Sequence, residues 1–155
     1  MAALSAPRCA SGGTLTETMG HIIYLAGRGQ RPTILLVESE TLLRVEIAGA
    51  LRRRDFQVLE AVHGEEALAL LRFGRMAHAM LSALDLDGGL SGLDLATTVQ
   101  REFPNVRPFL GASGDGSHDG QRFTRLARPY EPDVVEAAVR AWLTGQPGPA
   151  DSERP

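Results

Sequence analysis

The chain has 155 residues, of which 43% are hydrophobic and 23% are charged, and its net charge is -3. This length and composition suit one globular α/β domain with short tails, large enough to bury its own core. A mildly acidic chain without a basic patch argues against nucleic acid as the main partner. The single cysteine, Cys9, excludes a disulfide framework, and no apolar run reaches the roughly 18 to 20 residues that cross a bilayer. We therefore expect a cytoplasmic protein without a membrane anchor.

Both ends of the chain have the composition of tails. Residues 1–30 are rich in Ala, Ser, Gly and Thr and carry little periodic apolar signal, while residues 145–155 combine Gly, Pro and charges. Such segments bury too little apolar surface to offset the entropy of ordering them. We expect a flexible N-terminal tail over 1–30, a domain over 31–144 and a disordered C-terminal tail over 145–155.

Between the tails, short apolar runs alternate with segments of helical periodicity. The predicted strands are 33–37, 57–62, 77–84, 106–112 and 123–127, and the predicted helices are 41–54, 65–73, 93–103 and one that begins at Pro132. This alternation implies a doubly wound parallel sheet with right-handed crossovers, in the flavodoxin-like strand order 2-1-3-4-5. The connection over 114–122 is short and rich in turn residues, so we expect the fourth helix of the fold to be degenerate there.

Parallel strands bring their carboxyl ends to one edge of a sheet, and ligand sites form at that edge. The residues expected at these ends are Glu38 and Ser39, Ala83, Ser113, and Arg128. This convergence makes them the candidate site.

The residues around these strand ends resemble a known family. Ile-Leu-Leu-Val-Glu-Ser-Glu at 34–40, the run 80–92, Leu-Gly-Ala-Ser-Gly at 110–114 and Arg-Pro-Tyr at 128–130 are similar to the receiver domain of two-component response regulators. The resemblance implies a phosphoryl acceptor aspartate after the third strand and a magnesium-binding acidic pair after the first. It also implies a hydroxyl residue after the fourth strand and a lysine after the fifth.

Only two of these five positions match the pattern of the family. By this resemblance, Glu38 is the first acid and Ser113 is the hydroxyl residue, whereas Ser39 replaces the second acid and Arg128 replaces the lysine. Ala83 stands where the acceptor aspartate is expected, because Leu84, Asp85 and Leu86 before the glycine-containing loop reproduce the family pattern in that register. The alternative register makes Asp85 the phosphoryl acceptor.

A pocket with Ser39 and Ala83 keeps one carboxylate, that of Glu38, whereas magnesium normally binds several carboxylate oxygens. We therefore expect the magnesium site to be lost and no cofactor to bind. One hypothesis is that Arg128 pairs with Glu38 and fills the space of the missing ion and phosphoryl group. In the alternative, Arg128 reflects the lysine-free composition of the chain and points into solvent.

These expectations describe a degenerate receiver, or pseudo-receiver, that is not an enzyme. We expect it to act in bacterial two-component or phosphorelay signalling by phosphorylation-independent binding to a histidine kinase, a phosphotransfer protein or another regulator. Two alternatives stay open: a phosphoaccepting regulator that uses Asp85 in an altered geometry, and a protein that binds a small ligand in the same crevice. Homodimer formation also stays open.

Overall fold

The computed structural model describes residues 31–112 and 122–145. Most of the two predicted tails lies outside this part of the chain. So does nearly all of the connection where we expect a degenerate helix.

Five strands form one parallel sheet, in agreement with the sequence-based prediction. They are β1 (Thr33–Val37), β2 (Gln57–Ala61), β3 (Ala79–Ala83), β4 (Arg107–Ala112) and β5 (Thr124–Ala127). The strand order is β2-β1-β3-β4-β5, and every neighbouring pair is parallel. This is the predicted flavodoxin-like arrangement, and it places the carboxyl ends of all five strands at the same edge.

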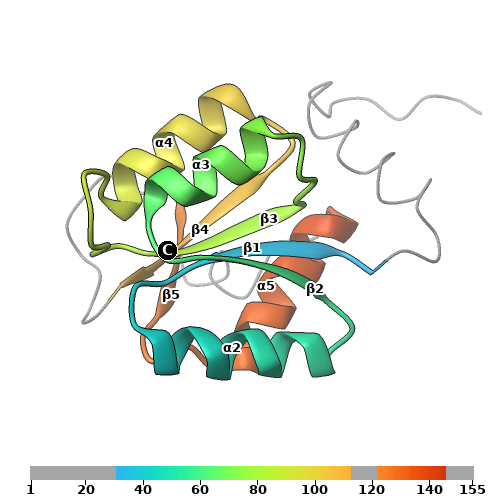
Figure 1. Ribbon diagram of the computed structural model, residues 1–155. Coiled ribbons are helices and arrows are strands. Elements are labelled where there is room, and N and C mark those ends of the chain that lie inside the picture. Colours follow the sequence, from blue (N-terminus) through green and yellow to red (C-terminus); the bar gives the residue numbers. More distant parts are fainter. Residues whose placement is uncertain (1–30, 113–121, 146–155) are drawn as a thin grey trace, which may run out of the picture.

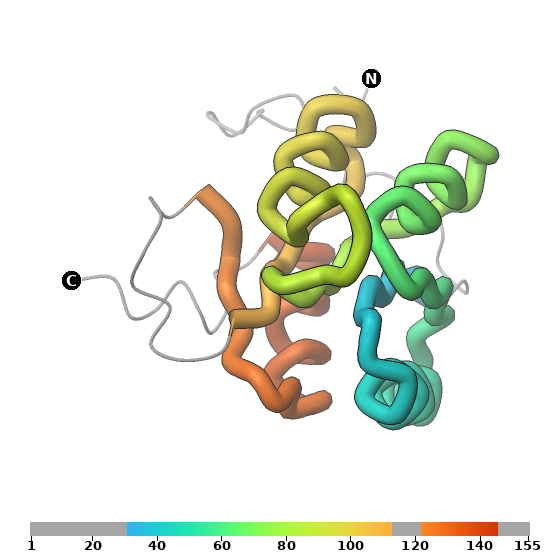
Figure 2. Tube along the Cα trace, turned by 60° about the vertical axis from the view of Figure 1, so that its left-hand side comes forward, coloured from blue at the N-terminus to red at the C-terminus, as the bar shows by residue number. Residues whose placement is uncertain are grey.

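Four helices within the described residues cover the two faces of the sheet. They are α2 (Thr41–Arg53), α3 (Gly64–Arg72), α4 (Gly92–Glu102) and α5 (Pro132–Thr144). In Figure 1, α3 and α4 lie above the sheet, and α2 and α5 lie below it. Figure 2 shows the same two layers from a second direction. None of the helices in the described ranges is long and apolar enough to cross a membrane.

The sheet separates two hydrophobic cores, because successive side chains of a strand point to opposite faces. In β1, Ile34 and Leu36 pack in the core beneath α2 and α5, whereas Leu35 and Val37 pack in the core beneath α3 and α4. All five residues of β1 and all five of β3 are buried. The central strands are therefore fixed on both faces, and the residues that follow them are held in place.

The ends of the helices and strands agree closely with the predictions. The observed bounds of the helices and strands lie within two residues of those predicted from periodicity. In α5, the buried positions are Val135, Ala138, Val139 and Leu143, and Trp142 is only partly buried. Trp142 therefore packs against the same core from the edge of the buried stripe.

Candidate functional site

Four of the five predicted site residues, Glu38, Ser39, Ala83 and Arg128, lie at the carboxyl edge of the sheet. Glu38 directly follows β1, Ala83 is the last residue of β3, and Arg128 directly follows β5. Ser113, predicted to follow the fourth strand as the hydroxyl residue, lies outside the described residues. The described part of the site is therefore built from β1, β3 and β5 and from the loops that follow them.

Glu38 is a buried carboxylate with both oxygens engaged. Its relative exposure is 2%. Its Oε2 accepts a hydrogen bond from Nη2 of Arg128 at 2.8 Å, and its Oε1 accepts one from the backbone N–H of Glu40 at 3.2 Å. The hypothesis that Arg128 pairs with Glu38 agrees with this geometry. The alternative that Arg128 points into solvent is wrong, because its side chain is only 18% exposed.

The guanidinium of Arg128 is held by an aromatic ring as well as by the carboxylate. It lies over the ring of Tyr130 at 5.6 Å from the centroid, a geometry that favours a cation–π interaction. Tyr130 is buried, and this burial raises the pKa of its phenol above the ordinary value. Arg128 is thus fixed between an anion and an aromatic face, so its charge is directed at Glu38.

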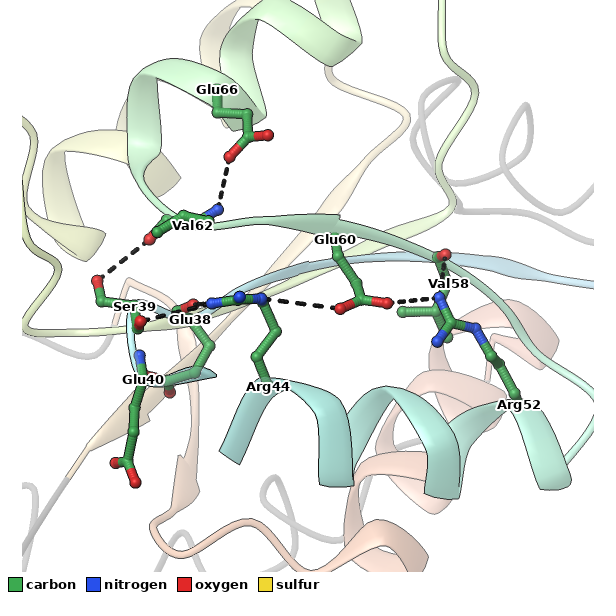
Figure 3. Close-up of polar contacts among 9 residues, drawn as sticks. All are labelled: Glu38, Ser39, Glu40, Arg44, Arg52, Val58, Glu60, Val62 and Glu66. Atoms are coloured by element: carbon green, nitrogen blue, oxygen red, sulfur yellow. Dashed lines mark hydrogen bonds and ion pairs between the residues drawn. The ribbon is translucent and has the colours of Figure 1, made fainter. Parts of the chain in front are cut away.

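Ser39 joins the loops that follow three different strands. Its hydroxyl donates to the carbonyl oxygen of Val62 at 3.1 Å, just beyond β2, and accepts from the backbone N–H of Asp87 at 3.0 Å, in the loop after β3. Figure 3 shows the contact with Val62. The Ser39 hydroxyl, at the position where the resemblance implies the second acid, therefore links backbone groups of two other loops by hydrogen bonds.

Arg44 is a component of the site that sequence reasoning missed. From the first turns of α2 its Nη1 donates to the carbonyl oxygen of Glu38 at 2.7 Å, and its Nε lies 3.7 Å from Oε2 of Glu60 (Figure 3). The arginine thereby supports the backbone that presents the Glu38 carboxylate. No sequence signal distinguishes Arg44 from the other arginines, because its contact depends on how the loop folds back onto the helix.

Ala83 faces the same side of the sheet as Glu38. Its position continues the alternation of Ala79 and Leu81, which pack in the core beneath α2 and α5. Ala83 pairs with Gly111 of β4 and is fully buried. Its side chain is a methyl group, so this strand end presents no nucleophile.

The start of α4 packs tightly against the end of β3. The backbone N–H of Gly92 donates to the carbonyl oxygen of Leu84 at 2.9 Å, and a Cβ at position 92 would overlap the carbonyl oxygen of Ala83. Between these two points lies the loop that carries Asp85, which is exposed to solvent. The two candidate acceptor positions thus differ in environment: position 83 is buried beside β4, and position 85 faces water.

The described residues hold no cluster of three or more His, Cys, Asp or Glu side chains that could bind a metal ion. At the carboxyl edge, the charged groups of the pocket form the ion pair between Glu38 and Arg128. Glu38 and Arg128 neutralise each other, whereas the buried hydroxyl of the adjacent Tyr130 has no hydrogen-bond partner among the described residues.

Comparisons with known proteins agree with the architecture. No family model matches the chain. The chain is 30% identical over 131 residues to the phosphate regulon transcriptional regulatory protein PhoB of Pseudomonas aeruginosa. The match covers 79% of this chain and 56% of that protein, so the chain spans about half the length of this curated relative.

Several solved structures share the fold. A signal receiver domain of an HD domain-containing protein from Pseudomonas fluorescens superimposes with a TM-score of 0.65 at 24% identity, covering 76% of this chain and 90% of that one. The receiver domain of the hybrid histidine kinase CckA gives 0.60 at 27% identity, covering 72% and 98%. A response regulator receiver protein from Sinorhizobium medicae gives 0.66 at 19% identity, covering 74% and 95%. The described residues therefore have the receiver fold of two-component signalling proteins.

Proposed function

We propose that this chain is a pseudo-receiver of a bacterial two-component or phosphorelay pathway, which binds signalling proteins without accepting a phosphoryl group. The observation that carries this proposal is the state of Glu38, whose two carboxylate oxygens are taken by Arg128 and by the backbone of Glu40. The carboxylate that would help to hold magnesium is thereby committed to contacts within the chain.

The remaining chemistry supports the same conclusion. Phosphoryl transfer to a carboxylate requires a nucleophile, a divalent cation and positive charge on the moving phosphoryl oxygens. Ala83 supplies a methyl group, and the Ser39 hydroxyl is bonded to backbone groups of two other loops. The charge of Arg128 is already balanced by Glu38. In this register the acceptor position lacks a nucleophile, and the side chains of Ser39 and Arg128 are held by contacts within the chain.

The proposal implies a binding role with no catalytic activity of its own and no magnesium cofactor. The partner would be a histidine kinase, a phosphotransfer protein or a second regulator, and the site of action would be the cytoplasm. Such a protein would compete with a phosphorylatable receiver for shared partners, and its binding would be the same in the presence and absence of phosphoryl donors.

Incubation of the full chain with acetyl phosphate and magnesium, followed by intact-mass analysis, tests the proposal. We expect no added mass, whereas a receiver with an aspartate at the acceptor position, treated in parallel, should gain a phosphoryl group. A hydroxylamine-sensitive adduct that disappears in Asp85→Asn would identify the exposed Asp85 as the acceptor and overturn the proposal.

Magnesium binding can be tested without any phosphoryl donor. A ligand that binds the folded state raises its stability by RT ln(1 + [L]/Kd). We expect millimolar magnesium to leave both the melting temperature and the fluorescence of Trp142 unchanged. A magnesium-dependent rise in melting temperature that is lost in Glu38→Gln would show that Glu38 still binds the ion.

A further inference from the structure

A pocket of about 290 Å³ opens at the amino ends of the strands, opposite the edge that carries Glu38. His78 and Val106, which lie just before β3 and β4, form its floor. Its walls come from the ends of α3, α4 and α5 and are mostly apolar, with the side chains of Leu71, Phe103, Trp142 and Leu143. In Figure 1, the end of α5 and the connection from α3 to β3 lie at the side where β1 begins.

Large apolar side chains stand exposed beside this pocket. Met76, which lines it, is 71% exposed, and Phe73, at the end of α3, is 89% exposed. Exposed apolar groups that adjoin an apolar pocket favour an apolar occupant, because its binding removes all of these surfaces from water.

The chain enters the domain beside this pocket. The backbone N–H of Thr33 donates to Nδ1 of His78 at 3.0 Å, and the N–H of His78 donates to the carbonyl oxygen of Thr33 at 2.8 Å. The first residue of β1 is therefore hydrogen-bonded to a residue that lines the pocket, whereas Pro32 and Arg31 contact Gln57 and Asp55 at the start of β2.

The sequence before β1 contains a fitting occupant. The longest apolar run in residues 1–30 is Ile-Ile-Tyr-Leu-Ala at 22–26, and six residues, Gly-Arg-Gly-Gln-Arg-Pro at 27–32, separate it from Thr33. Six residues span at most about 20 Å, so the run cannot move far from the pocket. A short tether of this kind gives the attached segment an effective concentration on the order of millimolar.

We propose that residues 22–26 of this chain dock into the pocket between α3, α4 and α5. Ile22, Ile23 and Leu25 supply the apolar side chains that meet the walls. The docked segment covers Met76 and contacts Trp142. A second copy of the chain or a free apolar ligand has to compete with a segment that is already tethered beside the site.

The test compares two double variants of the full chain. Ile22→Asp with Ile23→Asp places charges in the apolar run, and Leu4→Asp with Leu15→Asp adds the same charges elsewhere in the N-terminal segment. Trp142 is the only tryptophan and lines the pocket, so its fluorescence reports on the occupant. We expect the first variant to show a red-shifted emission, greater acrylamide quenching and a melting temperature lower by at least about 4 °C, and the control to match the wild type.

Binding of the dye 1-anilinonaphthalene-8-sulfonate provides a second measurement, which on the wild type depends on no variant. The wild-type chain should bind little dye, because the pocket is filled, and the Ile22→Asp, Ile23→Asp variant should bind more. Strong dye binding to the wild type, or unchanged Trp142 quenching and melting temperature in that variant, would overturn the proposal. Trp142 quenching that rises when the wild type is diluted would also overturn it, since that result assigns the pocket to a second copy.

Discussion

Arg128 differs from the lysine that the receiver pattern implies, and the difference determines what the pocket can hold. A guanidinium is planar, always charged and weakly hydrated, so it suits a buried ion pair better than an ammonium does. In this chain it reaches the Glu38 carboxylate at 2.8 Å and covers the ring of Tyr130. The residue that the resemblance places at the lysine position thus neutralises the buried carboxylate of Glu38.

Removing the guanidinium should leave the Glu38 carboxylate buried without its counter-ion. We expect Arg128→Met to lower the free energy of unfolding by about 3 kcal/mol, the cost of breaking one side of a buried ion pair. Urea unfolding at pH 7 followed by circular dichroism measures this change. Arg53→Met is the matched control, because Arg53 is exposed on α2 and its loss should cost less than about 0.5 kcal/mol.

A third variant separates the contribution of the ion pair to stability from that of packing against Tyr130. Arg128→Gln with Glu38→Gln removes both charges, and its loss of stability should be smaller than that of Arg128→Met alone. Equal losses in the two variants would show that the ion pair contributes little and that packing against Tyr130 accounts for the effect.

The sequence suggested the Glu38–Arg128 pair as one of two alternatives, from opposite charges expected at the same edge of the sheet. It did not predict the contact of Arg44 with the Glu38 backbone or the contact of Ser39 with Val62. Both of these end on backbone carbonyl oxygens, whose positions depend on loop conformation rather than on residue type. Side-chain charges can be read from a sequence, whereas free backbone acceptors cannot.

At the scale of helices and strands, the spacing of hydrophobic residues was sufficient to predict the type and approximate range of each element. Each element buries either one continuous stripe or two alternating faces. The strand order followed from the alternation of strands with helices, which restricts the connections to right-handed crossovers. Element ends were less predictable. Ala77 and Leu84 continue the apolar pattern of β3, yet the strand covers only Ala79–Ala83. Hydrogen bonds to the neighbouring strands continue one residue beyond each end, at His78 and Leu84.

Close contact between α4 and the end of β3 makes position 92 intolerant of a side chain. A Cβ there would overlap the carbonyl oxygen of Ala83, a backbone atom that cannot rotate away. We expect Gly92→Ala to destabilise the protein by about 2 kcal/mol, as overpacking does. Thermal unfolding monitored by circular dichroism measures the change.

The same substitution in α2 should have the opposite sign. At Gly49 the nearest atom to a new Cβ is Nη1 of Arg53, at 3.4 Å and at the end of a flexible side chain. Because alanine favours a helix over glycine, Gly49→Ala should stabilise the protein by about 0.5 to 1 kcal/mol. Equal effects at the two positions would contradict the proposed contact at Ala83.

His78, just before β3, makes stability depend on pH. Burial lowers its pKa from the ordinary value of 6.5, and its Nδ1 accepts the N–H of Thr33 and so must be unprotonated. The unfolded state therefore binds the proton more tightly than the folded state does. Its contribution to stability is complete above pH 6.5 and is lost as the pH falls through 6.5 toward the lower folded-state pKa.

The variant His78→Asn keeps an acceptor for Thr33 but cannot titrate. Between pH 7.5 and pH 5, the wild type should lose more stability than His78→Asn does in parallel urea titrations. The other three histidines are present in both proteins, so their effects cancel in the difference. Parallel pH profiles for the two proteins would show that His78 titrates alike in the folded and unfolded states.

At the scale of the whole molecule, the two edges of the sheet have different characters. At the carboxyl edge, Glu38, Arg128, Ser39 and Arg44 make polar contacts within the chain. The amino edge carries the apolar pocket and its exposed neighbours. The described residues thus have the receiver fold, with a polar ion pair at one edge of the sheet and an apolar pocket at the other.

Rebuilding the site tests whether these internal contacts replaced a phosphorylation pocket. Ala83→Asp alone should give a weak acceptor, because the new carboxylate lies beside Glu38 and would pair with Arg128. Ser39→Asp adds the second acid, and Arg128→Lys supplies a compact charge for a phosphoryl oxygen. Without metal, the triple variant should be less stable than the wild type. Three carboxylates repel one another, and the hydrogen bond from the Ser39 hydroxyl to Val62 is lost.

Magnesium should then recover part of the lost stability, and acetyl phosphate should add one phosphoryl group to the triple variant, because the sequence already supplies Ser113. Intact-mass analysis and thermal unfolding with and without magnesium measure these effects. Ser39→Asn with Ala83→Asn and Arg128→Lys is the matched control, which changes the same positions without adding acids and should neither bind magnesium nor gain mass. If the acidic triple variant folds but behaves like this control, then Glu38, Ala83 and Arg128 do not occupy the positions of a receiver pocket, and the pseudo-receiver proposal fails although the fold remains.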